Sequence, residues 1–414
     1  MKNKVLITLS LLLGLSAVSV PAEAQAGFKR VAYFIQWGIY GRNYHVKDVD
    51  ATGAAAKLTH LNYAFGFVNA EGSCYSADPW ADWQRPVPAE QSVDGVADAP
   101  GQALNGNLNQ LRKLKAKHPG LKVLISLGGW TGSKHFSDAV LTAESRATLA
   151  RSCIDLWLRG DLPGLEPGAG AGVFDGIDLD WEWPGSSGAE GNVIRPEDKQ
   201  NFTLFVEELR SQLKAYSRAA QLTAFLPAAA AKIDAGFEVR RVFSQLDFAT
   251  IQGYDLHGTW EPQTGHNGNL FTDRRDPNPV KYSVDQTVRD YLSRGAPARK
   301  IVVGVPAYGQ GWTGVTGGDG LYKPATGPAP GKWAPGSEDY KDLVNKPGKR
   351  YRDLRTGAMW LYDGNEFWSY DDPAMMLQKA AYIRLKGLGG SMMWSIDQDD
   401  ARASLTSALY SVLR

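Results

Sequence analysis

Three carboxylates alternate along one short apolar stretch of the chain. Residues 175–184 read Asp-Gly-Ile-Asp-Leu-Asp-Trp-Glu-Trp-Pro, so Asp178, Asp180 and Glu182 stand two apart. On a β-strand, side chains two apart leave from the same face, and the residues between these three are large and apolar. Like charges held so close cannot all ionise, so at least one pKa should rise, which is how a general acid is made. The stretch predicts an acid–base site.

A simpler interpretation of this strand also exists, because an antiparallel strand can expose one polar face to water. However, Asp and Glu are poor strand formers. The apolar lead-in and the stop at Pro184 are typical of a parallel strand that ends at a loop. In an α/β barrel, such strand ends lie at the rim where active sites gather. We therefore favour carboxylates that point into the interior of a barrel, near its functional rim.

Eight β-rich runs recur along the chain, and helical patterns separate them. The runs are Val31–Gln36, Leu58–Phe65, Leu121–Leu127, Val173–Trp181, Gln221–Leu226, Phe248–Tyr254, Ile301–Ala307 and Gly390–Ile396. Amphipathic stretches between them include Leu108–Lys117, Thr142–Leu158, Pro196–Ala215 and Val284–Ser293. This alternation predicts an α/β fold, a (β/α)8 TIM barrel over residues 27–309 and 370–414. A doubly wound open sheet is the alternative, although no Gly-rich phosphate turn follows the first run.

Two segments interrupt the alternation. Residues 66–106 read as a long polar loop that carries Trp80 and Trp83. Residues 310–369 hold short aromatic runs divided by Gly and Pro, and they are too rich in aromatics to stay unfolded. This second segment predicts a small α+β insertion domain between the seventh strand and its helix. That helix should begin near Asp372-Pro373, a capping residue followed by proline at the first turn.

The first 26 residues are typical of a secretory signal peptide. Lys2 and Lys4 precede an apolar run that ends at Pro21 and small residues, so cleavage is expected after Ala24 or Ala26. A retained membrane anchor is disfavoured, because the apolar run is shorter than the ~20 residues that a spanning helix needs. We expect a secreted, extracellular protein that acts as a monomer.

Charge and cysteine content narrow the possibilities further. The net charge is +1, which argues against nucleic acid or a membrane surface as the main partner. Cys74 and Cys153 are the only cysteines, one in a Gly/Ser loop and the other in an expected helix. Export permits a disulfide, but this placement makes a bond between them the less favoured outcome. The chain contains an unusually large number of tryptophans, 13 in all. Flat aromatic rings of this kind also bind the apolar faces of sugars.

Four motifs, taken in chain order, resemble those of glycoside hydrolase family 18, the chitinases. They are the third-strand motif Ser126-Leu-Gly-Gly-Trp130, the DxxDxDxE signature at 175–182, the sixth-strand pair Tyr254-Asp255, and Trp394 at the end of strand eight. Residues 310–369 are placed like the chitinase insertion domain of that family. The resemblance covers essentially all of residues 27–414, and its motifs are specific in combination.

The resemblance implies a role for each catalytic residue. Glu182 would protonate the glycosidic oxygen and later act as the base that deprotonates water. This family uses no carboxylate nucleophile, because the acetamide of the substrate attacks the anomeric carbon and forms an oxazolinium intermediate. Asp180 would orient that acetamide, and Asp178 would share a proton with Asp180. Tyr254 would donate to the acetamide oxygen, and Asp255 would bind the distorted sugar.

A further set of residues is implied to bind the sugar chain. Trp394 would form the floor under the N-acetyl sugar beside the cleaved bond, and Trp130 would stack on the leaving-group side. Tyr33 and Ser126 would hydrogen-bond Asp178. Weaker candidates for sugar platforms are Trp37, Trp260, Trp312, Trp80 and Trp83.

One position departs from the family pattern. The sixth-strand motif usually begins with methionine, and Gln252 stands there, which bears on contacts near the acetamide pocket and on fine substrate preference. His257 and His266 share a loop without partners at ligand spacing, so we expect loop or substrate-contact roles and no metal site. No cofactor is expected, because the substrate supplies the nucleophile.

The sequence therefore predicts a chitinase that hydrolyses the β-1,4 links of chitin and N-acetylglucosamine oligomers. An endo-β-N-acetylglucosaminidase acting on N-glycans shares the catalytic signature and remains an alternative. A chitin-binding lectin typically lacks the catalytic carboxylate, which is present here as Glu182. A metal-dependent hydrolase would use the acidic cluster as ligands. An insertion domain that forms one wall of a deep cleft would favour a long polymer over an N-glycan.

Overall fold

Eight parallel strands close into a barrel in the computed structural model, which describes residues 27–414. The signal peptide expected over residues 1–26 lies outside the described residues. Neighbours around the ring follow the order β1-β15-β8-β7-β6-β5-β4-β2, and pairing of β1 with β2 closes it. The strands are β1 Lys29–Ile35, β2 His60–Val68, β4 Lys122–Gly128, β5 Gly176–Asp180, β6 Gln221–Leu226, β7 Phe248–Ile251, β8 Ile301–Pro306 and β15 Gly390–Trp394. Each expected run overlaps one of them, so the predicted barrel is confirmed.

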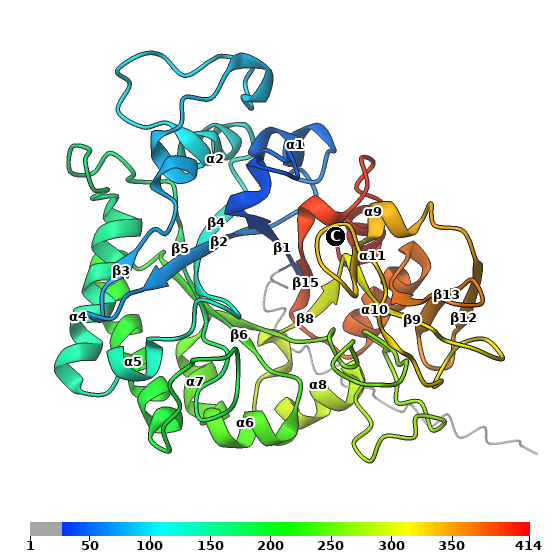
Figure 1. The fold of residues 1–414 in the computed structure, drawn as a ribbon. Coiled ribbons are helices and arrows are strands. Elements are labelled where there is room, and N and C mark those ends of the chain that lie inside the picture. Colours follow the sequence, from blue (N-terminus) through cyan, green and yellow to red (C-terminus); the bar gives the residue numbers. More distant parts are fainter. Residues whose placement is uncertain (1–26) are drawn as a thin grey trace, which may run out of the picture.

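Helices cover the outside of the ring (Figure 1). They are α1 Val46–Ala51, α2 Gly106–Lys117, α3 Phe136–Ala139, α4 Ala143–Cys153, α5 Asp198–Tyr216, α6 Ala230–Gly236, α7 Val239–Gln245, α8 Val284–Ser293, α10 Pro373–Leu385 and α11 Ser404–Leu413. The strands are almost wholly buried, because the barrel interior packs on one face and the helices on the other. The helix α10 begins as predicted, with Asp372 accepting a 3.0 Å hydrogen bond from the Met375 amide. No helix within residues 27–414 is both long and apolar enough to cross a membrane.

A second, antiparallel sheet lies beside the barrel (Figure 1). In the sequence, it is inserted between β8 and α10. Its elements are β9 Tyr308–Thr313, β10 Gly327–Pro328, β11 Ser337–Asp339, α9 Tyr340–Leu343, β12 Lys349–Asp353, β13 Ala358–Tyr362 and β14 Phe367–Tyr370. The predicted α+β insertion between the seventh barrel strand and its helix is therefore present. This sheet has a small core of its own around Trp312, Trp360 and Phe367. Trp312 is fully buried there, so its expected contact with sugar is wrong.

The segment 66–106, expected as a polar loop, contains short ordered elements. The strand β3 Cys74–Tyr75 pairs with β2, and single turns form over Trp80–Gln84 and Ala89–Gln91. Trp83 is buried against Trp157, with ring centroids 6.5 Å apart, so it is a core residue and not a sugar platform. Cys74 and Cys153 form a disulfide with Cα atoms 4.9 Å apart. Our expectation of unpaired cysteines is thus wrong, because β3 folds back onto the end of α4.

Candidate active site

Strand register brings the acidic residues together at the carboxyl end of β5. Asp178 lies level with Ser126 on β4 and with Thr223 on β6. Asp178 is fully buried in the barrel interior, and Asp180 and Glu182 follow it with 3% and 9% exposure. The predicted alternation of inward carboxylates therefore leads from the barrel core to its rim.

Asp178 accepts hydroxyl hydrogen bonds on both of its carboxylate oxygens. Tyr33 Oη and Ser126 Oγ donate to Oδ2 at 2.7 and 2.8 Å, as expected from the sequence. Thr223 Oγ1 donates to Oδ1. Sequence reasoning missed Thr223, because one inward hydroxyl in a β-rich run leaves no signal. Burial raises the pKa of Asp178, whereas these hydroxyl donors lower it by favouring the charged form.

Asp180 and Glu182 are held in surroundings that favour protonated carboxyls. Burial raises the pKa of Asp180 well above its ordinary value, and the neighbouring charges of Glu182 and Asp178 raise it further. The pKa of Glu182 rises to about 8 through burial and the charge of Asp255, while Lys232 opposes the rise. Asp180 Oδ1 is buried and accepts no hydrogen bond from the described residues. The Glu182 carboxyl is therefore suited to holding and moving a proton near neutral pH.

Glycines at the end of β4 let its backbone pass directly against Asp180. The Gly129 amide donates to the Asp180 carbonyl at 2.8 Å. A Cβ added to Gly128, whose φ is +111°, would lie 2.5 Å from that same oxygen. Ser133 Oγ accepts from the Glu182 amide at 2.9 Å and thereby fixes the next residue of the series. The Ser-Leu-Gly-Gly-Trp motif therefore positions the acidic segment as well as carrying Trp130.

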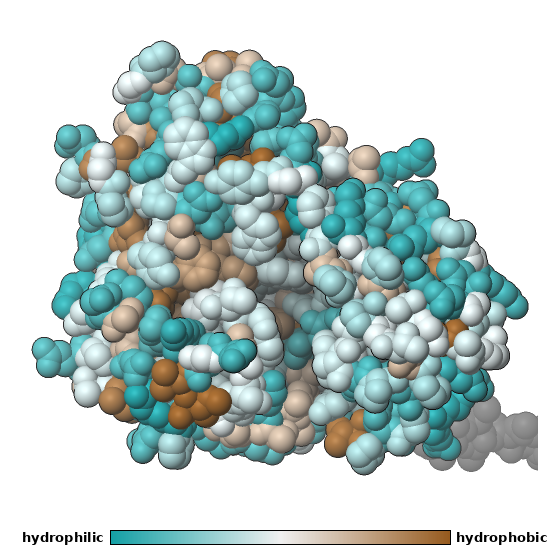
Figure 2. Space-filling model, viewed as in Figure 1, coloured by the Kyte–Doolittle hydropathy of each residue, from teal (hydrophilic) through white to brown (hydrophobic). Residues whose placement is uncertain are grey.

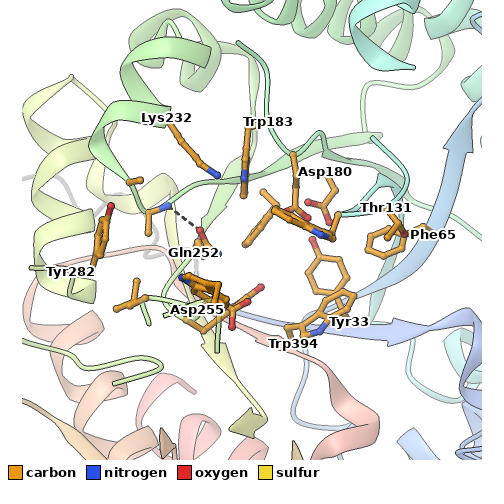
Figure 3. Close-up of a pocket in the computed structure, with 18 of the residues that line it drawn as sticks. Tyr33, Phe65, Thr131, Asp180, Trp183, Lys232, Gln252, Asp255, Tyr282 and Trp394 are labelled. Carbon is orange, nitrogen blue, oxygen red and sulfur yellow. Dashed lines mark hydrogen bonds between the residues drawn. The ribbon is translucent and has the colours of Figure 1, made fainter. Parts of the chain in front are cut away.

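Asp180 and Glu182 line a cavity of about 890 Å³ at the carboxyl ends of the barrel strands. Figure 2 shows this face of the molecule hollowed at its centre. The cavity is lined by most of the predicted site residues, which are Glu182, Asp180, Tyr254, Asp255, Trp394, Trp130, Tyr33, Gln252, Trp37 and Trp260. Asp178 and Ser126 lie beneath it. Gln252 Oε1 accepts a 3.2 Å hydrogen bond from the Ala228 amide (Figure 3).

A continuous aromatic wall runs along one side of this cavity. Trp394 stacks on Phe65 with centroids 5.7 Å apart, and Phe65 stacks on Trp37 at 6.2 Å. Figure 3 shows Trp394 beside Tyr33 and Phe65. Sequence reasoning missed Phe65, because phenylalanine in an apolar run reads as core. The open platforms are Trp37, Trp130 and Trp260, which are 41%, 51% and 63% exposed. Trp80 is exposed but does not line the cavity.

The insertion domain supports the cavity without lining it. Tyr308 Oη and Gln310 Nε2 on β9 donate to Asp255 Oδ1 at 2.6 and 2.8 Å. Burial raises the pKa of Asp255, and these two donors oppose the rise. Trp312 Nε1 donates to the Glu261 carbonyl at 3.1 Å, which fixes the loop between β7 and α8. Leu256, Trp260 and Glu261 of that loop line the cavity, whereas none of residues 310–369 is among its lining residues.

His257 and His266 are buried within this loop and do not line the cavity. His257 lies 2.8 Å from Glu261 Oε2 and 3.2 Å from Asp276 Oδ2. Burial lowers its pKa, but the two carboxylates outweigh burial and raise the pKa to about 9. His266 lies 3.6 Å from Asp273, and burial lowers its pKa. Both histidines therefore take the loop role, one of the two roles predicted from the sequence, and neither lines the cavity.

A model of the family described as "Glycosyl hydrolases family 18" matches residues 29–399. Chitinase C of Streptomyces lividans is 38% identical over 379 residues, which cover 90% of this chain and 57% of that protein. The catalytic domain of psychrophilic chitinase B from Arthrobacter TAD20 superposes with a TM-score of 0.91 at 44% identity, covering 94% of this chain and 95% of that one.

A second similar structure holds a ligand. It is a mutant of the Ostrinia furnacalis group II chitinase catalytic domain 2, in complex with penta-N-acetylchitooctaose, (NAG)5. Its TM-score is 0.78 at 30% identity, and the match covers 94% of this chain and 96% of that one. The chain spans 57–61% of the length of the first curated relatives that it matches.

Proposed function

The chain belongs to glycosyl hydrolases family 18, and on that premise we propose that it is a secreted chitinase. It would hydrolyse the β-1,4 links between N-acetylglucosamine units of chitin with net retention. The observation that most supports this activity is the buried series Asp178, Asp180 and Glu182, which ends in an open aromatic cavity. Secretion is supported by the signal-like sequence of residues 1–26.

Glu182 is the proposed general acid and base. A pKa of about 8 keeps its carboxyl largely protonated at neutral pH, so that it can give a proton to the glycosidic oxygen. The resulting carboxylate then takes a proton from the water that opens the intermediate. One group performs both steps, and a pKa close to the working pH suits both.

The acetamide of the substrate is the proposed nucleophile, and its carbonyl oxygen closes an oxazolinium ring on the anomeric carbon. Asp180 Oδ1, buried and without a donor among residues 27–414, is available to accept the acetamide N–H and to stabilise the positive ring. Asp178, with its three hydroxyl donors, exchanges a proton with Asp180 as that side chain turns. Tyr254 donates to the acetamide oxygen, and Asp255 binds the distorted sugar.

Aromatic rings provide the proposed platforms for the sugar chain. Trp394 forms the floor beneath the sugar that carries the reacting acetamide, and its stacking on Phe65 fixes the orientation of the ring. Trp130, half exposed, would stack a sugar on the leaving-group side. Apolar platforms combined with a few polar groups suit a neutral polysaccharide.

The variant Glu182→Gln tests the proposal, because glutamine keeps the shape of the side chain but cannot donate the proton. Hydrolysis of chitohexaose should fall by ~10²–10⁴-fold or more. Glu190→Gln, at an exposed position outside the cavity, should retain the wild-type rate. Thermal unfolding would show that both variants are folded. Near-normal turnover by Glu182→Gln would overturn the assignment of the general acid.

Substrate choice and turnover separate the alternatives. An endo-β-N-acetylglucosaminidase would release N-glycans from a glycoprotein faster than it degrades colloidal chitin, and we expect the reverse. A lectin would bind chitin oligomers without turnover. The intact acidic series favours an enzyme over a lectin.

A further inference from the structure

Among the described residues, one basic side chain lines an otherwise acidic cavity. Lys232 stands on α6 and is half-buried, and Figure 3 shows it reaching toward Trp183. The acidic residues that line the same cavity are Asp180, Glu182, Asp255 and Glu261. Within residues 27–414, the only hydrogen bond of the Lys232 ammonium goes to a backbone carbonyl, that of Ser187, at 3.0 Å. Its charge is therefore not neutralised by a carboxylate in direct contact.

The surroundings of Lys232 leave its ammonium free to meet a ligand. Nζ lies 5.5 Å from the centre of a Trp183 ring, on the face that attracts cations. A lysine ammonium carries three donors, so two remain after the bond to Ser187. Burial lowers the pKa of Lys232, and the charge of Glu182 raises it.

Lys232 acts on one carboxyl of the site in particular. Its charge lowers the pKa of Glu182, whereas the charges that act on Asp180 are those of Glu182 and Asp178. The geometry agrees, because the Trp183 ring that lies 5.5 Å from the ammonium belongs to the residue directly after the proposed proton donor. Because that donor faces the leaving oxygen, Lys232 belongs to the leaving-group side of the cleaved bond.

We propose that Lys232 selects acetylated sugars on the leaving-group side, an inference that rests on the proposed function. An N-acetylglucosamine unit presents a neutral acetamide, whose carbonyl can accept a hydrogen bond from the ammonium. A deacetylated unit presents an ammonium of its own and has no such carbonyl. Two cations then meet in a partly dehydrated cavity, where their repulsion is stronger than in water. Lys232 is a specificity-determining residue that combines attraction for one unit with rejection of the other.

A purely structural lysine offers a matched comparison. Lys199 Nζ donates to the Asp234 carbonyl at 2.7 Å, and Lys199 does not line the cavity. Both lysines therefore tie their segment to a backbone carbonyl, but only Lys232 reaches the site. If the tie alone mattered, loss of either ammonium would leave sugar selectivity unchanged.

Partially acetylated chitosan separates the two roles. Wild type, Lys232→Met, Lys232→Arg and Lys199→Met would digest it, and mass spectrometry would identify the first two units at the new non-reducing ends of the products. These units occupied the leaving-group side before cleavage. In the products of wild type, we expect glucosamine at these two units about tenfold less often than its fraction in the substrate would give. Lys232→Met should lose most of this bias, while Lys232→Arg and Lys199→Met should keep it.

Hydrolysis of fully acetylated chitohexaose distinguishes failure of the inference from failure of the proposed function. If wild type does not cleave it, the proposed function fails, and the inference falls with it. If wild type and Lys232→Met both cleave it but show the same bias on chitosan, only the inference is overturned. Equal loss of bias in Lys232→Met and Lys199→Met would also overturn it, because the effect would not come from the cavity.

Discussion

Raising the pH from 7 to 9 should deprotonate Glu182 and lower the turnover of chitohexaose about tenfold. The pKa of Glu182 is about 8, since burial and the charge of Asp255 raise it and Lys232 lowers it. A carboxyl with that pKa is protonated in about nine molecules of ten at pH 7, and in about one of ten at pH 9. A glutamate with an ordinary pKa near 4.5 would be protonated in fewer than about one molecule of a hundred at pH 7.

Initial rates at saturating chitohexaose, measured from pH 5 to 10, give the pH at which turnover falls, which is the alkaline limb of the pH–rate profile. Circular dichroism at each pH would show that the protein stays folded. Lys232→Met removes the cation that lowers the pKa of Glu182, so the limb should move to higher pH. Lys199→Met, outside the cavity, should leave it in place. A wild-type limb near pH 5, or a limb that moves to lower pH in Lys232→Met, would refute the electrostatic reasoning.

Three further changes test other parts of the account. Trp394→Ala should lower kcat/KM on chitohexaose about tenfold or more by removing a stacking platform, whereas Trp80→Ala should leave it unchanged. Replacing Cys74 and Cys153 with serine should lower the free energy of unfolding in urea by about 4 kcal/mol, because the bond closes a loop with a sequence separation of 79; a loss below about 1 kcal/mol would contradict this. The raised pKa of Glu182 lowers the free energy of unfolding as pH rises from 4.5 to 8, because Glu182 ionises at a lower pH in the unfolded chain than in the folded protein. The free energy of unfolding of Glu182→Gln should therefore rise relative to that of wild type by about 1.4 kcal/mol for each pH unit in that window. A difference between the two proteins that does not change with pH would contradict this.

The barrel and the acidic series could be predicted because their signals are local. Each barrel strand is an apolar run between turns, and carboxylates inside such a run are costly unless they serve a function. Thr223, Phe65 and Lys232 could not be found in this way, since each is an ordinary residue in its own segment. The register of β6, the stacking against Trp394 and the position of α6 bring them to the site, and these are long-range features.

The wrong predictions concern segments that fold back over long distances. The disulfide joins residues whose proximity depends on β3 returning to α4, which no local pattern records. Trp312 lies in a Gly-rich stretch that reads as exposed, yet a small sheet needs large rings for its core. The contacts of the insertion domain with the site could not be predicted for a similar reason. Its strand β9 holds Asp255 and the β7–α8 loop from behind, and only the arrangement in space shows this.

The configuration of the first-formed sugar tests the central claim most directly. Attack by the acetamide and then by water inverts the anomeric carbon twice, so the product should first appear as the β-anomer. Proton NMR during the first minutes of chitohexaose hydrolysis by wild type, before mutarotation mixes the anomers, would record it. The account predicts an initial excess of the β-anomer, and an initial excess of the α-anomer would contradict it.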